Sequence, residues 1–183
     1  MKLETLILAA GKGTRMRSKL PKVLHKVGGK EMIRHVIDAA KKAGSAREVV
    51  VIGSGAQLVR ETIAGVEFVV QEEQLGTGHA VLSAKKNFEK SEGTLLILCG
   101  DTPLLTDKLL KNFTAAHENS KCAATVLTAK MPDATGYGRI IREDDGNFKK
   151  IVEENDATEL ETTIREVNAG VYCFDVKKLF GAL

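Results

Sequence analysis

A glycine-rich stretch near the start of the chain, AAGKGTRM, carries side chains that suit a phosphate group. Gly11 and Gly13 allow a tight turn that brings backbone N–H groups close to an oxygen-rich ligand. Arg15 can grip two oxygens at once, and Lys22, which follows the stiff Pro21, adds a point charge. The segment is therefore interpreted as a cradle for a triphosphate. The alternative is a surface loop with solvated cations.

Two common phosphate-binding loops do not fit this stretch. A P-loop requires GxxxxGK followed by Ser or Thr, whereas Gly13 is followed by Thr14. A dinucleotide-binding loop requires a third glycine at the position where the chain has Met16. The stretch nevertheless follows an apolar run directly, and open α/β sheets bind ligands beyond the carboxyl ends of their strands. This position favours a phosphate cradle of another type.

A second candidate is Asp101, which ends the apolar run LLILCGD with Gly100 beside it. Mg²⁺ takes one or two protein carboxylates and completes its shell with water and phosphate oxygens. One carboxylate at the end of a buried strand therefore predicts a magnesium site. The alternative is a cap of the turn that Thr102 and Pro103 begin.

The four histidines are scattered without zinc spacing or a Ser-His-Asp arrangement, and we expect structural roles for them.

The three cysteines are Cys99, Cys122 and Cys173, and no two of them have CxxC spacing. An odd number of distant cysteines is typical of reduced thiols. Cys99 stands two residues before Asp101, so it is either a small buried apolar side chain or part of the same site.

The composition is that of an ordinary globular domain. The chain has 183 residues, of which 43% are hydrophobic and 28% charged, enough for one substantial core. A net charge of +3 and an aromatic content of only 4% argue against a nucleic-acid partner. Glu4 interrupts the apolar start, which argues against a signal peptide, and no apolar run is long enough for a membrane span. We expect a cytoplasmic protein with no membrane partner.

Short apolar runs alternate with segments of helical periodicity along the first two thirds of the chain. Strands are predicted at 3–9, 48–52, 67–70 and 94–98. Helices are predicted at 30–43, 56–64 and 77–88, and a further helix is capped by Thr106, with Leu109, Leu110, Phe113 and His117 as its inner face. Buried strands separated by helices predict a parallel sheet with helices on both faces.

The pattern changes after a further strand at 123–128. Runs at 139–142 and 148–152 flank the turn residues EDDG, which predicts an antiparallel hairpin, and 167–174 supplies a last strand. The predicted fold class is α/β: a Rossmann-like, open, mostly parallel sheet with helices on both faces, plus a small antiparallel hairpin. We expect a single domain over residues 1–183.

Several motifs of the chain, in this order, resemble those of one family: LAAGKGTRM, LPKVLH, QEEQLGTGHA, CGDTPLL, TGYGRI, IVEENDAT and EVNAG. From about Leu6 to Val171 the chain resembles the uridylyltransferase domain of the bifunctional N-acetylglucosamine-1-phosphate uridylyltransferase/glucosamine-1-phosphate acetyltransferases. The first two motifs mark only the wider group of sugar-phosphate nucleotidylyltransferases, whereas QLGTGHA together with TGYGRI is more specific. The resemblance implies a fold of the nucleotide-diphospho-sugar transferase type.

The activity that this resemblance implies is a Mg²⁺-dependent transfer of uridylyl from UTP to N-acetylglucosamine 1-phosphate. Its products are pyrophosphate and UDP-N-acetylglucosamine, a precursor of peptidoglycan and lipopolysaccharide in the cell wall. Two alternatives stay open: a related transfer that uses glucose 1-phosphate with UTP or dTTP, and a nucleotide-sugar-binding fragment without catalysis.

The resemblance also implies roles for individual residues. The expected catalytic cations are Arg15 and Lys22, and the expected metal ligand is Asp101. The expected nucleotide-binding residues are Leu8, Ala9, Ala10, Gly11, Cys99 and Gly100, with Gln71, Gly76 and Thr77 around the uracil. The expected sugar-binding residues are Gly138, Glu153 and Asn168. A glutamine amide presents a donor and an acceptor side by side, which matches uracil O4 and N3–H.

Two features of the family have no counterpart in this sequence. One is a second metal ligand, an asparagine in a later segment; the other is a carboxyl-terminal left-handed β-helix that carries the acetyltransferase and builds a trimer. We therefore expect an incomplete, monomeric domain that binds nucleotide but turns over slowly.

Overall fold

The computed structural model describes residues 2–11, 13 and 16–183. The chain forms two compact units. The first comprises the chain up to Thr125 together with Tyr172–Leu183, and the second comprises Val126–Val171. No helix in the described part of the chain combines the length and the apolar character needed to cross a membrane.

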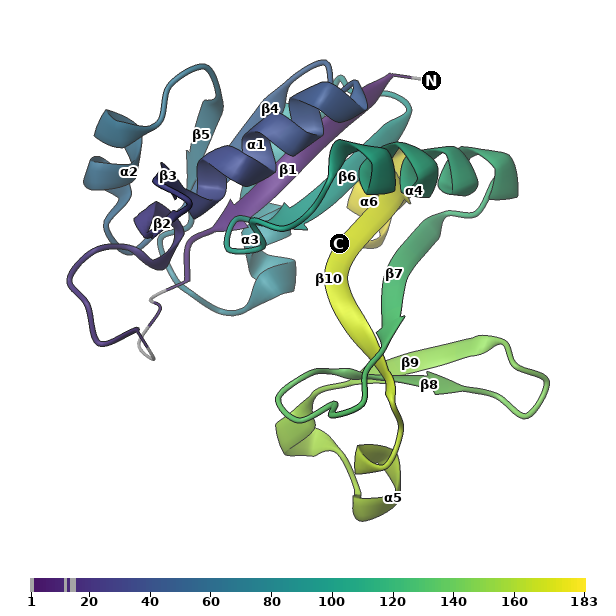
Figure 1. Ribbon diagram of the computed structural model, residues 1–183. Helices are drawn as coiled ribbons and strands as arrows, with labels where there is room; N and C mark the ends of the chain where they lie inside the picture. The colour runs from purple at the N-terminus through teal and green to yellow at the C-terminus, as the bar shows by residue number, and fades with distance from the viewer. Residues whose placement is uncertain (1, 12, 14–15) are drawn as a thin grey trace. The chain divides into compact units, whose positions relative to one another are not determined.

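The first unit is built on an open sheet whose parallel strands lie in the order β5, β4, β1, β6 (Figure 1). These strands are β1 (Leu3–Ala9), β4 (Glu48–Ile52), β5 (Glu67–Val70) and β6 (Thr94–Cys99). The end of β10 (Glu166–Asp175) pairs antiparallel with β6. All four strands predicted from apolar runs are confirmed, and β6 is one residue longer than predicted. Because β1 lies between β4 and β6, even its Glu4 and Thr5 are buried.

Helices cover both faces of this sheet, because side chains along a strand alternate between its two faces. On one face, α1 (Met32–Ala43) and α4 (Asp107–Ser120) pack against each other and against β1 and β6 (Figure 1). On the other face, apolar side chains of β1, β4 and β6 form a buried cluster with α3 (Thr77–Ser83) and α6 (Val176–Ala182). The predicted α/β fold class is confirmed.

The first helix begins two residues later than the sequence predicts. Lys30–Glu31 forms a short strand, β3, which pairs with β2 (Lys26–Val27). Gly28 and Gly29 join the two strands with φ angles of 59° and 82°. Two consecutive residues with positive φ suit the tight turn of a two-residue hairpin, which competes with the helical pattern at this point. The helix ends as predicted at Gly44, which adopts a φ of 102°.

Helices α2 (Ala56–Thr62) and α3 also end before the predicted positions, and the chain after α3 continues as the 3-10 helix η3 (Lys85–Phe88). The cap of α4 is confirmed, because the Thr106 hydroxyl accepts a hydrogen bond from the N–H of Leu109 at 3.2 Å.

The predicted inner face of α4 is wrong at Leu109, which is 38% exposed. The buried residues of the helix are Leu110, Phe113, Thr114 and His117. These four follow the i, i+3, i+4, i+7 spacing of one helical face, and Leu109 lies about 100° away from Leu110 around the axis.

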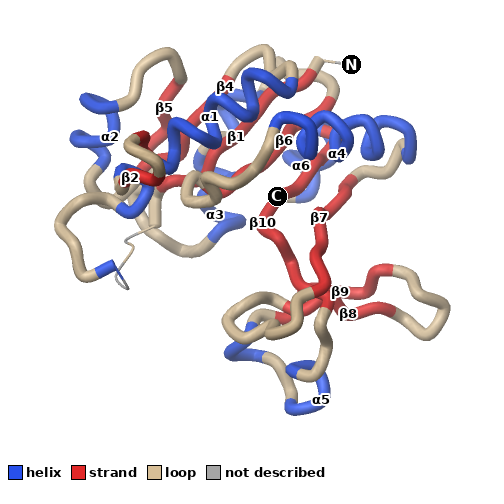
Figure 2. The backbone as a smooth tube through the Cα atoms, viewed as in Figure 1, coloured by secondary structure: helices blue, strands red, loops and turns tan. Residues whose placement is uncertain are grey.

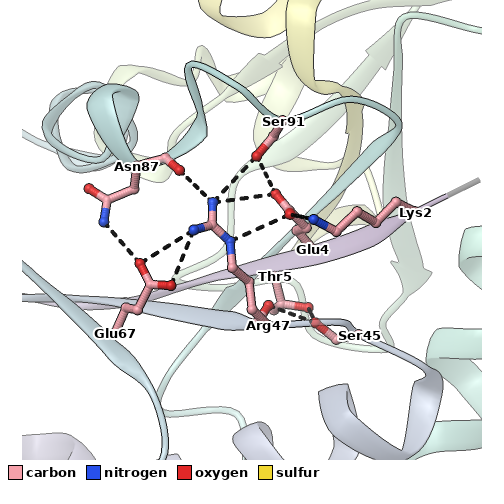
Figure 3. Close-up of polar contacts among 8 residues, drawn as sticks. All are labelled: Lys2, Glu4, Thr5, Ser45, Arg47, Glu67, Asn87 and Ser91. Atoms are coloured by element: carbon pink, nitrogen blue, oxygen red, sulfur yellow. Dashed lines mark hydrogen bonds and ion pairs between the residues drawn. The ribbon is translucent and has the colours of Figure 1, made fainter.

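A polar network around Arg47 closes the amino-terminal end of this sheet (Figure 3). The buried Glu4 carboxylate forms ion pairs with Lys2 at 2.6 Å and with Arg47 at 3.5 Å. It also accepts a hydrogen bond from the hydroxyl of Ser91. Arg47 also pairs with Glu67 at 3.1 Å. Burial raises the pKa of Glu4, but the hydrogen bonds from Lys2 and Ser91 and the charge of Arg47 outweigh it. The net result is a pKa below the usual range.

The second unit consists of short strands, loops and single helical turns (Figure 2). Its elements are β7 (Ala124–Lys130, which starts in the first unit), β8 (Arg139–Arg142), β9 (Phe148–Val152), the 3-10 helix η4 (Glu154–Asp156), α5 (Glu159–Thr162) and the first part of β10. The predicted hairpin is confirmed, because β8 and β9 pair antiparallel on either side of the turn. Thr158 and Glu161 form a capping box that starts α5.

Candidate nucleotide site

Two hollows of the first unit meet at the carboxyl ends of β1 and β6. The larger, of about 510 Å³, is lined in part by Leu8, Ala9, Gly11, Lys22, Cys99 and Asp101. The smaller, of about 320 Å³, is lined in part by Leu8, Ala10, Gly11, Gln71, Gly76 and Thr77. Leu8, Gly11 and Cys99 line both hollows, so the two are adjacent. The structure thus brings together side chains that the sequence places in four separate segments.

The glycine loop has a structural role in addition to the predicted contact with phosphate. Gly13 has a φ of 59°, and a Cβ atom at this position would lie 2.8 Å from the Cβ of Lys22. A side chain at Gly13 would therefore push away the segment that carries the cation. Gly11 has no heavy atom within 4 Å of a Cβ atom added there. Its lack of a side chain leaves space in both hollows.

The backbone around Lys22 is held in place on both sides. Val23 and Leu24, which follow it in the 3-10 helix η2 (Lys22–Leu24), are buried. Pro21, which precedes it, lies so close to Gly55 that a Cβ there would come within 2.5 Å of the proline ring. The position of the lysine is therefore fixed by packing of its neighbours, while its own side chain is 36% exposed.

Lys22 and Asp101 meet in the larger hollow. The Nζ atom of Lys22 lies 2.5 Å from Oδ2 of Asp101, and both side chains are about one-third exposed. One of the two expected catalytic cations is thus in contact with the expected metal ligand. The other cation, Arg15, lies outside the described residues. The carboxylate of Asp101 therefore contacts a cationic side chain in this hollow.

The donor set around Asp101 fits a magnesium ion. The carboxylate is bound on one oxygen by Lys22 and borders an open hollow of about 510 Å³. Mg²⁺ usually binds through one or two carboxylates and keeps water and phosphate oxygens in its other positions. A hollow of this size leaves room for both.

Gly100 and Cys99 connect β6 to this site in different ways. Gly100 packs behind the hollows: its N–H donates to the carbonyl of Leu8 at 2.9 Å, and a Cβ there would lie 3.2 Å from the side chain of Val23. Cys99 borders both hollows. Burial and the charge of Asp101 raise the pKa of its thiol to about 11, although Lys22 acts in the opposite direction. At neutral pH the side chain is therefore an uncharged thiol.

The smaller hollow is formed where β5 ends and α3 begins. Gln71 follows β5 and is held by its own N–H, which donates to the carbonyl of Ile52 at 2.8 Å. Its side-chain nitrogen lies 3.2 Å from the carbonyl oxygen of Gly76. Gly76 precedes α3 with a φ of 102°, a conformation that favours glycine. The three residues expected around the uracil thus form one local group.

The three residues expected to hold the sugar lie together within the second unit. The N–H of Asn168 donates to the carbonyl of Gly138 at 2.8 Å. A Cβ atom at Gly138 would lie 3.1 Å from Oε1 of Glu153, so glycine permits the close approach of this carboxylate. The Asn168 side-chain oxygen accepts from the N–H of Gly170 at 3.0 Å.

Two polar side chains that were not predicted as site residues, Arg139 and His79, support these groups. Arg139 is buried in the second unit and pairs with Glu154 at 2.6 Å, while Glu154 also accepts from the N–H of Gly136 at 3.1 Å. His79 lies 3.0 Å from the side-chain nitrogen of Gln71. The pair of Arg139 and Glu154 has no sequence signal. For His79, the available signal was its position three residues after Gly76 at the start of a helix.

Solved structures share this fold. UDP-glucose pyrophosphorylase complexed with UDP-glucose superposes with a TM-score of 0.76 at 21% identity, covering 98% of this chain and 78% of that one. HddC from Yersinia pseudotuberculosis superposes with a TM-score of 0.75 at 22% identity, covering 97% and 78%. The fold therefore defines an open, mostly parallel α/β protein, in which a glycine loop, a lysine and an aspartate line a hollow at the carboxyl edge of the sheet.

Residues 5–142 match the model of the MobA-like NTP transferase domain, and the chain belongs to this family. It is 53% identical to the bifunctional protein GlmU of Alkaliphilus metalliredigens (strain QYMF) over 98% of its length. It is 54% identical to the corresponding protein of Lactobacillus johnsonii (strain CNCM I-12250 / La1 / NCC 533) over 97%. In both cases it spans 39% of the relative. The resemblance found in the sequence motifs is thereby confirmed, and the chain is a nucleotidyltransferase domain.

Proposed function

We propose that this domain transfers uridylyl from UTP to N-acetylglucosamine 1-phosphate, with Mg²⁺ as cofactor. The observation that carries the proposal is the contact of Lys22 with Asp101 in a hollow adjacent to the one lined by Gln71, Gly76 and Thr77. The similarity to bifunctional GlmU proteins and the motifs QLGTGHA and TGYGRI support this choice of substrates.

In the proposed reaction, an oxygen of the sugar phosphate attacks the α-phosphorus of UTP in line. A new P–O bond forms as the bond between the α-phosphorus and the bridging oxygen to the β-phosphate breaks, and pyrophosphate leaves. The attacking oxygen belongs to the substrate, so the protein has to supply position and charge. Lys22 stabilises the negative charge that grows on the leaving phosphates. Arg15 has the same proposed role.

Lys22 and Asp101 change partners when the ligands bind. An ion pair that is one-third exposed stabilises by at most about 1 kcal/mol, so phosphate can separate the pair at little cost. The ammonium group of Lys22 would then turn to the phosphates, and the carboxylate of Asp101 would be available to hold Mg²⁺. When bound, Mg²⁺ neutralises phosphate charge and orients the triphosphate.

In the second unit, Glu153 and Asn168 suit the hydroxyl and acetamido groups of the sugar. The Glu153 carboxylate accepts hydrogen bonds from hydroxyls, and the Asn168 amide both donates and accepts. Gly138 keeps the approach to Glu153 open, because a side chain there would press on the carboxylate.

A calorimetric titration tests this function. We expect the chain to bind UDP-N-acetylglucosamine more tightly than UDP-glucose and to bind it more tightly with Mg²⁺ than without. We also expect pyrophosphate to be released from UTP with N-acetylglucosamine 1-phosphate. A preference for UDP-glucose or dTDP-glucose would favour the related transfer. Binding that is indifferent to Mg²⁺, without turnover, would favour a non-catalytic nucleotide-sugar-binding domain.

A further inference from the structure

We propose that His79 is a positioning residue that makes the smaller hollow selective for uracil over cytosine. It acts by fixing the side-chain amide of Gln71 so that its oxygen, and not its NH₂ group, is available to the base. This inference deepens the proposed function and depends on it, because it requires that a pyrimidine nucleotide occupies the hollow.

The amide of Gln71 is oriented by two contacts to its nitrogen. Nε2 lies 3.2 Å from the carbonyl oxygen of Gly76 and 3.0 Å from Nδ1 of His79. An amide NH₂ group has two hydrogens, and these two acceptors use both of them. A flipped amide would bring its oxygen against the oxygen of Gly76, so two acceptors would face each other. The carbonyl of Gly76 and Nδ1 of His79 together hold the amide in this orientation.

The same contact defines the state of the imidazole. Because Nδ1 accepts from the amide of Gln71, the proton of the neutral ring is on Nε2. His79 stands in the first turn of α3 and is half-buried, and its backbone carbonyl accepts from the hydroxyl of Ser83 at 2.9 Å. Gln71 is 3% exposed, so its amide has little room to move. The ring is thus held by the helix, and the amide by the ring.

This arrangement corrects the idea that the glutamine offers a donor and an acceptor side by side to the base. Its donor is used inside the protein, and Oε1 has no hydrogen-bond partner within the described part of the chain. An acceptor alone suits uracil, whose N3–H is a donor. Cytosine has an acceptor at N3, so its lone pair would face that of Oε1. Selectivity therefore comes from a repulsive contact as well as an attractive one.

The test uses two variants of His79 and two nucleotides. His79→Leu removes the acceptor, whereas His79→Asn places an amide oxygen near the position of Nδ1. Calorimetry with Mg²⁺ gives the ratio of the dissociation constants of CTP and UTP. We expect His79→Leu to lower this ratio about tenfold, because one N–H of the buried amide loses its partner and turns to the base. We expect His79→Asn to retain most of it.

If the role of His79 is purely structural, both variants should weaken the binding of UTP and of CTP equally. The ratio of the two dissociation constants would then stay unchanged, which would overturn the proposal. If the wild-type chain itself binds UTP and CTP equally, the proposed uridylyl transfer fails instead. Proton exchange of the Gln71 side-chain amide, followed by NMR in the wild-type chain without nucleotide, tests the orientation alone. Slow exchange of both protons is expected, and rapid exchange of either would contradict the role of His79.

Discussion

At the scale of single residues, the candidate site depends on Lys22, whose backbone is fixed by buried neighbours while its side chain is partly exposed. Val23 and Leu24 anchor the segment of Lys22 in the core, yet the ammonium group lies at the surface of the hollow. A charge that is positioned before the substrate binds needs less reorganisation during the reaction. The contribution of Lys22 is therefore expected in the rate of the chemical step more than in the stability of the fold.

Replacing Lys22 by alanine should raise the barrier of pyrophosphate release by about 2–4 kcal/mol, because the growing charge on the leaving phosphates loses its partner. The free energy of unfolding should change by less than about 1 kcal/mol, since the pair with Asp101 is one-third exposed. Lys19→Ala is the matched control, because Lys19 is an exposed lysine of the same segment. Steady-state rates and urea unfolding measure the two effects. Equal rates in the two variants would remove Lys22 from the mechanism.

The two glycines of the loop should respond differently to alanine. At Gly13 the new Cβ meets Lys22 at 2.8 Å and the φ of 59° is unfavourable, so Gly13→Ala should lower the free energy of unfolding by about 1–3 kcal/mol. Gly11→Ala meets no atom within 4 Å and should leave stability unchanged. It should still weaken UTP binding, because the methyl group enters the hollows. Urea unfolding measures the effect on stability, and calorimetry measures the effect on UTP binding. Loss of stability in Gly11→Ala would contradict this assignment.

Among the elements, α4 shows how one helix face carries the packing of the first unit. Leu110 is fully buried and Leu109, its neighbour, is 38% exposed. We expect Leu110→Ala to reduce the free energy of unfolding by about 2–5 kcal/mol, because it leaves a cavity. Leu109→Ala should cost less than about 1 kcal/mol. Denaturant unfolding of both variants measures the difference, and equal costs would show that the helix is rotated from this orientation.

The sequence predicts the elements of the first unit well, because their signals are local. The apolar runs 3–9, 48–52 and 67–70 coincide with β1, β4 and β5. The hairpin at 26–31 was missed, since its four strand residues carry no apolar alternation and only the paired glycines indicate the turn. Helix ends were overestimated for a similar reason: the apolar period continues into η3, where the chain tightens into a 3-10 helix.

The candidate site was predictable only as a list of residues. Motifs single out Lys22, Asp101 and Gln71, and the rule for parallel strands places them at one edge of the sheet. The contact between Lys22 and Asp101 depends on the packing of Pro21 against Gly55, which joins segments that no local pattern links. The orientation of the Gln71 amide depends on His79, for which the sequence suggested only a structural role.

Considered as a whole, the sheet of the first unit has two chemically different ends. Its carboxyl end opens into the hollows, where charged groups are partly solvated. Its amino end is closed by Arg47, which joins Glu4 of β1 to Glu67 of β5 and to the loop that carries Ser91 (Figure 3). The open end supplies the candidate chemistry, and the closed end contributes to the stability on which it depends.

The closed end should make stability depend on pH. Glu4 has a pKa below its usual range in the folded protein, because hydrogen bonds and the charge of Arg47 outweigh its burial. The contribution of Glu4 to the free energy of unfolding is therefore fully present above the pKa of an unfolded glutamate, about 4.3. This contribution is lost as the pH falls through the lower pKa of the folded state. Glu4→Gln should reduce the free energy of unfolding by roughly 1–3 kcal/mol at pH 7.

The difference between the wild-type chain and Glu4→Gln should become smaller as the pH is lowered from 7 toward 3, because the wild-type carboxylate then takes up a proton. Urea unfolding at a series of pH values measures it. Glu72→Gln is the control, since Glu72 is exposed and its replacement should give a small difference at every pH. A Glu4→Gln difference that stays constant or grows on acidification would mean that the charge on Glu4 does not stabilise this end of the sheet.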